Sequence, residues 1–194
     1  DVLDLLEECN RKKPVWVELG LQTAKDVTAA RLNRGYDRSV YESAVASLHQ
    51  RNISVITHLI FGLPGENRED MLNSVEYAGR YTDGIKLQML QILKGSVLGE
   101  TYLQTPFPLL SQEEYVSLVC DAIDLLPESV VIHRLTGDPP SVLLIAPQWT
   151  CDKKKVLAEI KKKGAKTFVA LNPATPIWNE TTGLCEDCSN FTDC

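Results

Sequence analysis

The chain has 194 residues, which suits one domain or slightly more. Its 44% hydrophobic and 24% charged residues exclude a disordered or collagen-like chain, and no apolar stretch approaches the roughly 20 residues that cross a bilayer. The formal net charge of −6 weighs against a free-standing nucleic-acid binder. Because no signal-peptide pattern is present, we expect a cytoplasmic, reducing setting and no membrane partner.

Predicted strands and helices alternate through the first half of the chain, a pattern typical of parallel βα units. Ser39 and Glu42 are spaced as a capping box, which predicts a helix start there with Val40, Ala44 and Leu48 on its apolar face. The other predicted helices cover residues 1–13, 24–33 and 67–80, and the predicted strands cover 15–21, 53–61 and 85–93.

The pattern changes after Gly95, where we predict a domain boundary. Ser111 and Glu114 cap a helix that runs to about residue 126, and short strands are predicted over 130–133 and 142–146. Asp152 caps a lysine-rich helix that Gly164 ends, and this basic stretch is interpreted as a solvated face in preference to a docking patch. A last strand over 167–171 and an irregular tail over 172–194 follow, so the predicted units are 1–95, 96–166 and 167–194.

Three of the predicted strands carry polar groups on one face and apolar side chains on the other, because alternate residues of a strand share a face. The polar members are Glu18, His58, Lys86 and Gln88. Burying such groups without partners is costly, so they need one another, water or a ligand. A parallel barrel with a polar cavity explains them jointly, and an internal Glu18–Lys86 network is the structural alternative.

A glycine-rich turn follows the second of these strands and precedes a helix. It spans Gly62 to Glu66 and includes Pro64 and Gly65. Glycines there let the backbone approach a ligand closely, and the following helix offers free N–H groups. Taken alone this signal is weak, because Gly-Pro turns are common in loops.

Several short sequences in fixed order resemble the radical S-adenosylmethionine (SAM) proteins of the YhcC type, a group related to the catalytic subunit of elongator and to oxygen-independent coproporphyrinogen oxidase. The resemblance covers roughly residues 1–155. The segments that carry it are 18–23, 32–35, 58–66, 85–90, 93–96 and 131–138.

The resemblance implies an α/β fold, the carboxyl-terminal half of a partial (βα)6, TIM-like barrel followed by a small α/β extension. It implies an oxidoreductase in which an electron donor and a 4Fe–4S cluster cleave SAM to a 5′-deoxyadenosyl radical that abstracts hydrogen from an unknown substrate. The catalytic face would be Glu18, His58, Lys86 and Gln88. The cofactor-binding residues would be Gln22, Thr23, Gly62, Pro64, Gly65 and Glu66, and Lys94, His133, Arg134 and Asp138 would lie on the substrate side.

The family's CxxxCxxC cluster motif does not occur in the chain. The chain also begins at Asp1 rather than Met, so we expect the cluster loop and the first three barrel strands to lie upstream. This chain alone is then predicted to be inactive. Relatives act on tRNA among other molecules, and the acidic balance does not indicate tRNA here.

Two other functions stay open. Half a barrel could serve as a non-catalytic binding domain, or the tail could be a small thiolate metal-binding module. Cys185, Cys188 and Cys194 form CxxC-x5-C, which suits tetrahedral metal binding but lacks a fourth ligand. An unpaired edge strand at residues 15–21 also predicts self-association.

Overall fold

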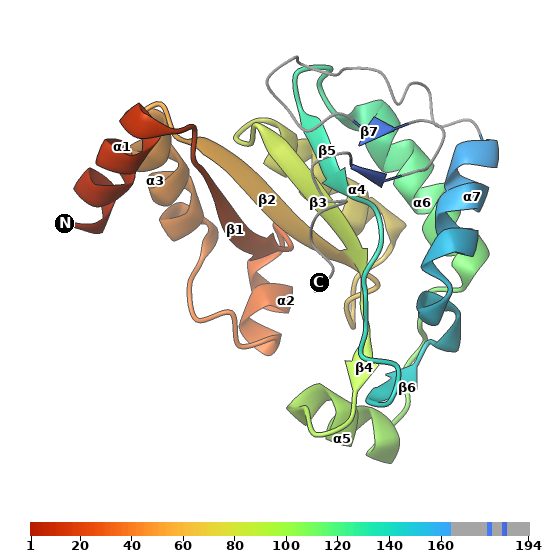
Figure 1. The fold of residues 1–194 in the computed structure, drawn as a ribbon. Coiled ribbons are helices and arrows are strands. Elements are labelled where there is room, and N and C mark those ends of the chain that lie inside the picture. Colours follow the sequence, from red (N-terminus) through yellow and green to blue (C-terminus); the bar gives the residue numbers. More distant parts are fainter. Residues whose placement is uncertain (164–177, 180–183, 186–194) are drawn as a thin grey trace.

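The computed structural model describes residues 1–163, 178–179 and 184–185 of the chain (Figure 1). Strands and helices alternate as predicted in the first half. The elements are α1 (Val2–Lys12), β1 (Trp16–Gln22), α2 (Asp26–Arg31), α3 (Arg38–His49), β2 (Ser54–Phe61), α4 (Arg68–Gly79), β3 (Gly84–Met89), β4 (Ile92–Leu93), α5 (Val97–Gln104), α6 (Gln112–Leu125), β5 (Val131–Arg134), β6 (Leu144–Ala146), the 3-10 helix η1 (Gln148–Cys151), α7 (Lys153–Lys163), β7 (Trp178–Asn179) and β8 (Leu184–Cys185).

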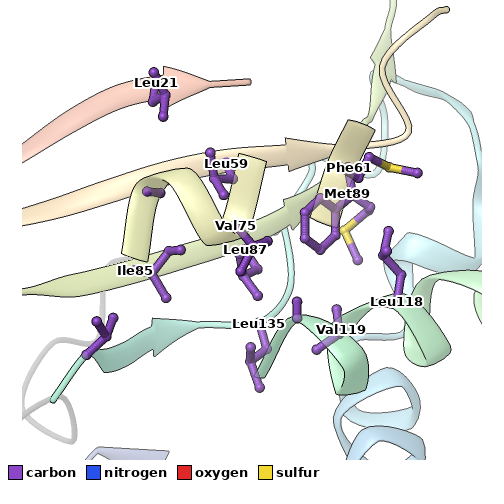
Figure 2. Close-up of a cluster of buried hydrophobic side chains, with 14 of the residues drawn as sticks. Leu21, Leu59, Phe61, Val75, Ile85, Leu87, Met89, Leu118, Val119 and Leu135 are labelled. Atoms are coloured by element: carbon purple, nitrogen blue, oxygen red, sulfur yellow. The ribbon is translucent and has the colours of Figure 1, made fainter. Parts of the chain in front are cut away.

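A parallel sheet in the order β1-β2-β3-β5 organises the molecule. Buried side chains of α3, α4 and α6 form one core with the apolar face of this sheet. Figure 2 shows Leu59, Ile85 and Leu87 of the sheet beside Val75 of α4 and Leu118 and Val119 of α6. The face predicted to be apolar is therefore the covered one, and the opposite face is the one with polar side chains.

Helix starts follow capping chemistry, with one correction. The predicted capping box of Ser111 and Glu114 opens α6, and Asn67 with Asp70 forms another at α4. The box predicted for Ser39 and Glu42 is wrong. Asp37 caps α3 instead, because its carboxylate accepts hydrogen bonds from the N–H groups of residues 39 and 40.

The apolar face predicted for α3 is also shifted. Val40 is 53% exposed, whereas Tyr41, Val45 and Leu48 are buried against the sheet. The hydroxyl groups of Tyr41 and of Thr57 in β2 also form a hydrogen bond of 2.7 Å. The spacing of these three residues is that of one helix face, and it starts one residue later than the prediction.

The single strand predicted over 85–93 is broken in two. β3 ends at Met89, and the N–H of Leu90 donates to the carbonyl of Phe61, which closes the ladder between β2 and β3. β4 then pairs antiparallel with β6, away from the main sheet. Figure 1 shows β4, β6 and α5 together beyond the carboxyl end of β3. Lys94 was expected on the substrate side, but it is exposed after β4, beyond the strand that carries Lys86 and Gln88.

The region after Gly95 contributes to the same sheet. β5 pairs with β3 in parallel, and α6 shares the core described above. The helix α5 was not predicted, because Gly99 in its first turn is a poor helix former, although Ser96 caps the helix. The domain boundary near Gly95 stays a prediction.

The lysine-rich helix is α7, and Asp152 accepts a hydrogen bond from the N–H of Lys155 as a cap. Val156 and Ile160 are fully buried, while every lysine of α7 is exposed. In the tail, β7 and β8 form an antiparallel pair, so the prediction of an irregular segment is wrong there. The strand predicted over 167–171 lies outside the described residues.

Candidate functional site

The polar face of the sheet carries an ion-paired cluster drawn from three neighbouring strands. The Glu18 carboxylate on β1 accepts a hydrogen bond from Lys86 Nζ of β3 at 2.5 Å, and its other oxygen lies 2.7 Å from His58 Nε2 of β2. His58 stands opposite Lys86 in the parallel register. The face predicted from sequence is thus correct, and the pairing of Glu18 with Lys86 is the one foreseen as the structural alternative.

The cluster is partly open to solvent, and its charges favour the ionised carboxylate. The side chain of Glu18 is 39% exposed, and that of Lys86 is 14% exposed. Desolvation alone would raise the pKa of Glu18, but the hydrogen bonds and charges of Lys86 and His58 outweigh it and hold this pKa below its usual range. Glu18 therefore carries its negative charge at neutral pH.

His133 of β5 joins the same face. The register between β3 and β5 is irregular after Ile85, and the missing side chain of Gly84 leaves room for the imidazole. Its ring centroid lies 6.2 Å from that of Trp16. Burial, followed by the charge of Lys86, lowers the pKa of His133. The sequence placed His133 in the region after Gly95 but did not place it beside Lys86, because a β-bulge has no clear sequence signal.

Gln88 lies on the same face, one pleat closer to the carboxyl end of β3 and opposite Ile60 of β2. Beyond it, where β1, β2 and β3 end, the chain forms an open pocket of about 400 Å³. The pocket is lined by Gln22, Leu32, Arg34, Tyr36, Ile60, Leu63 and Leu90. Of these, only Gln22 was predicted from sequence as a binding residue.

Arg34 fixes the exit of β1 at this pocket. Its guanidinium donates to the carbonyls of Leu21 at 2.8 Å and Thr23 at 2.9 Å and pairs with Asp26 at 3.0 Å. The side chain is only 4% exposed, and it lies over the ring of Tyr36. Arg34 lies within segment 32–35, which carries the family resemblance, but a partner set made largely of backbone carbonyls cannot be read from a sequence.

Thr23 and Glu66, both predicted to bind a cofactor, face each other and do not line the pocket. The Thr23 hydroxyl donates to Glu66 at 2.5 Å, and Thr23 is fully buried. Gly62 and Gly65 have φ angles of +86° and +85°, which side chains rarely adopt, so the turn depends on these glycines. The turn continues directly from Leu63, a pocket residue, through Pro64 and Gly65 to Glu66.

The remaining predicted residues lie apart from the pocket lining. Arg134 is exposed at the end of β5, and Asp138 lies 4.0 Å from Lys153 of α7. Cys185 belongs to β8, while Cys188 and Cys194 lie outside the described residues. Within the part of the chain that the structure describes, no three His, Cys, Asp or Glu side chains are arranged to hold a metal ion.

The fold is that of part of a parallel α/β barrel with a pocket at the carboxyl ends of its strands, the position where such barrels bind ligands. Residues 1–78 match the family model of the radical SAM superfamily, and residues 82–166 match that of the radical SAM C-terminal domain. The chain belongs to the radical SAM superfamily.

Two curated relatives and one solved structure support this assignment. YtqA of Bacillus subtilis is 40% identical over 164 residues, which cover 84% of this chain and 51% of the relative. YhcC of Escherichia coli K12 is 37% identical over 155 residues, which cover 79% and 50%. The chain therefore spans about half the length of these relatives.

The solved structure is that of Elp3 from the archaeon Methanocaldococcus infernus. It matches with a TM-score of 0.65 at 20% identity, covering 84% of this chain and 39% of that one. The likeness confirms the predicted α/β fold of a partial TIM-like barrel. Among the described residues, no helix has the length and apolar character needed to cross a membrane.

The pocket fits SAM in its chemistry. Leucine and isoleucine side chains offer an apolar surface for an adenine ring, and Gln22 adds a polar group at the end of β1. For the family's 4Fe–4S cluster, by contrast, the described residues offer no set of ligands. The described residues that line the pocket therefore suit the nucleoside part of the family's chemistry.

Proposed function

We propose that this chain forms the SAM-binding carboxyl half of a radical SAM oxidoreductase. The observation that carries the proposal is the pocket at the exits of β1, β2 and β3, walled by Leu32, Ile60, Leu63 and Leu90 and continued by the Gly62–Glu66 turn. Membership of the superfamily supports it. The CxxxCxxC motif is absent from the sequence, so we propose that the cluster ligands come from protein outside this chain.

In this function the residues of the pocket bind and orient, and they exclude water. Arg34 holds the end of β1, where Gln22 lines the pocket. The apolar walls shield the nucleoside from solvent. When bound beside a reduced 4Fe–4S cluster, SAM supplies a 5′-deoxyadenosyl radical for hydrogen abstraction.

The Glu18–His58–Lys86 cluster would form the polar interior of the barrel, below the pocket. Lys86 keeps Glu18 ionised, and Glu18 in turn orients the His58 ring. We propose that this face, with Gln88 and His133, contacts the substrate or positions the groups that do. An electron donor is a required partner of this chemistry, and neither it nor the substrate is selected by the geometry.

A binding measurement on this chain tests the first step. We expect micromolar to millimolar SAM affinity by calorimetry, weakened about tenfold in Gln22→Gly by loss of one polar contact. Gln22 has a φ of +58°, which glycine tolerates, so the variant should fold normally. Asn52→Gly is the matched control, since Asn52 has a φ of +56° and is not part of the pocket lining.

A second measurement tests the chemistry on the whole protein that includes this chain. Purified without oxygen and loaded with iron and sulfide, it should form 5′-deoxyadenosine from SAM only when dithionite is added. If the chain does not bind SAM and the whole protein takes up no cluster, the enzyme proposal fails. A non-catalytic binding domain would then be the better account, and the mutual pairing of Glu18 with Lys86 would agree with it.

A further inference from the structure

Two walls of the pocket are joined by a buried polar contact behind it. One wall is the end of β1 with Gln22, and the other is the Gly62–Glu66 turn with Leu63. The contact between them is the hydrogen bond from the Thr23 hydroxyl to Glu66 Oε1. Thr23 directly follows Gln22, so any movement of this contact shifts the neighbouring pocket residue.

The hydrogen bonds around Thr23 define the direction of that contact. The N–H of Lys25 donates to Thr23 Oγ1 at 3.0 Å, and the N–H of Ala24 donates to the Ser74 hydroxyl at 3.0 Å. Ser74 in turn donates to the Asp70 carbonyl at 3.0 Å. The Thr23 hydroxyl also lies 3.4 Å from the Ser74 hydroxyl, but its much shorter contact is the 2.5 Å hydrogen bond that it donates to Glu66.

The second carboxyl oxygen of Glu66 is in an unusual position. Oε2 is buried and has no hydrogen-bond partner among the described residues. A buried carboxylate oxygen without a donor costs several times more than a neutral carboxyl group in the same place. The geometry thus favours a carboxyl group that keeps its proton.

We propose that Glu66 is a protonated latch, a positioning residue that holds the two walls of the pocket together through Thr23. The inference rests on the proposed SAM site, but the latch itself is a property of the ligand-free chain. Glu66 does not touch the ligand in this arrangement. Its role is to keep Gln22 and Leu63 at a fixed separation, which lowers the ordering cost of binding.

The surrounding charges agree with this state. Burial raises the pKa of Glu66, and the hydroxyls of Thr23 and Thr28, which favour the ionised carboxylate, only partly oppose this. Asp70 raises the pKa further, while Lys25 lowers it but is itself paired with Asp70 at 2.7 Å. Arg31 is a further charged group in this region, with Nη1 3.0 Å from where a Cβ on Gly65 would stand.

The raised pKa of Glu66 fixes the sign of the pH dependence of the latch. A group whose pKa is raised by folding stabilises the folded arrangement fully at acid pH, and this contribution is lost as pH rises through the raised pKa. The latch should thus loosen on the alkaline side of the ordinary carboxyl range. A glutamine has no proton to lose, so Glu66→Gln should keep the latch at every pH.

Hydrogen exchange of the ligand-free chain tests the latch directly. Segments 21–26 and 62–67 should exchange about tenfold faster in Glu66→Ala and in Thr23→Val, which each remove one buried hydrogen bond. Glu66→Gln and Thr23→Ser keep the donor–acceptor pair and should stay within about twofold of the natural chain. Glu69→Gln, at an exposed glutamate in the same part of α4, is the matched control.

The pH profile separates a protonated latch from a merely structural contact. The ratio of exchange rates between the natural chain and Glu69→Gln should stay constant, while the ratio between the natural chain and Glu66→Gln should rise with pH. If Glu66→Gln exchanges as fast as Glu66→Ala, or if the second ratio is flat, the inference is wrong. Should Glu66→Ala fail to fold, the pair Thr23→Val and Thr23→Ser decides.

SAM affinity supplies the link to function. Glu66→Ala should weaken binding about tenfold and Glu66→Gln by less than about twofold. If the natural chain does not bind SAM, the proposed function fails, while the exchange experiment still decides the latch. If SAM binds equally to all variants although exchange changes, the latch does not position the pocket, and this part of the inference is overturned.

Discussion

Glu18 and Glu66 show how the pKa of the same side chain shifts in opposite directions in two regions around one sheet. Glu18 lies on the open polar face with Lys86 and His58 as partners, and its pKa is lowered. Glu66 lies behind the strand ends with threonine hydroxyls and, among the described residues, no cation bonded to it, and burial raises its pKa. Both are desolvated, so the partners and not burial alone decide the outcome.

The two regions also differ in how they are built. The open face is held by side chains that pair with each other, so each charge is compensated locally. The exit of β1 is held by side chains that bind backbone carbonyls and N–H groups, chiefly Arg34, Thr23 and Ser74. Substitutions should therefore cost more at the exit, where unpaired backbone groups would be left buried.

The largest effect is expected for Arg34→Met. The change leaves the carbonyls of Leu21 and Thr23 without this donor and removes one partner of Asp26. Because the Arg34 side chain is 4% exposed, we expect a loss of about 3 kcal/mol in the free energy of unfolding, measured with urea.

Arg38→Met is the control for that comparison. Arg38 pairs with the same Asp26 at 3.0 Å, but its side chain is 44% exposed. Arg38→Met should lower the free energy of unfolding by less than about 1 kcal/mol. Equal costs for the two variants would contradict the view that the exit depends on buried backbone contacts.

An intermediate effect is expected for Lys86→Met, which removes the charge and keeps most of the aliphatic stem. Glu18 is 39% exposed, so screening limits the loss to about 1 kcal/mol at neutral pH. The lowered pKa of Glu18 contributes stability above the ordinary carboxyl range, and this is lost as pH falls through the lowered value. The difference between the two proteins should thus vanish at acid pH.

The same variant has a spectroscopic consequence. The charge of Lys86 contributes to the lowered pKa of His133, so Lys86→Met should raise that pKa in an NMR titration. Lys154→Met, at an exposed lysine of α7, should change neither the free energy of unfolding nor the pKa of His133. An unchanged His133 titration in Lys86→Met would show that the two groups do not share one site.

These regions also differ in how far the sequence predicts them. The period of two in β1, β2 and β3 is a local property, so the shared face of Glu18, His58 and Lys86 follows from the sequence alone. His133 reaches this face where the register between β3 and β5 shifts, and after the break that follows Met89 the chain pairs as β4 with β6, far away in sequence. Neither has a local signal.

The pocket was predicted only in part, for a related reason. A glycine-rich turn after a strand is visible in the sequence, and it does adjoin the pocket through Leu63. The direction in which Thr23 and Glu66 point depends on tertiary packing between β1 and α4, which spacing does not encode. The motif therefore identified a segment that adjoins the pocket, but it did not reveal that Thr23 and Glu66 pair with each other and lie outside the pocket lining.

The smallest effect on stability is expected at the edge of the sheet, at Trp16. β1 pairs only with β2 in the described sheet, and Trp16 is 49% exposed on the polar face. An open strand edge beside an exposed aromatic ring favours association with another chain.

Trp16→Lys should change the free energy of unfolding by less than about 0.5 kcal/mol, while lowering the mass measured by light scattering at high concentration. Val97→Lys, which replaces an 86% exposed side chain on α5, should leave that mass unchanged. If the natural chain is a monomer at every concentration, the edge is protected, and the sequence-based expectation of self-association is wrong.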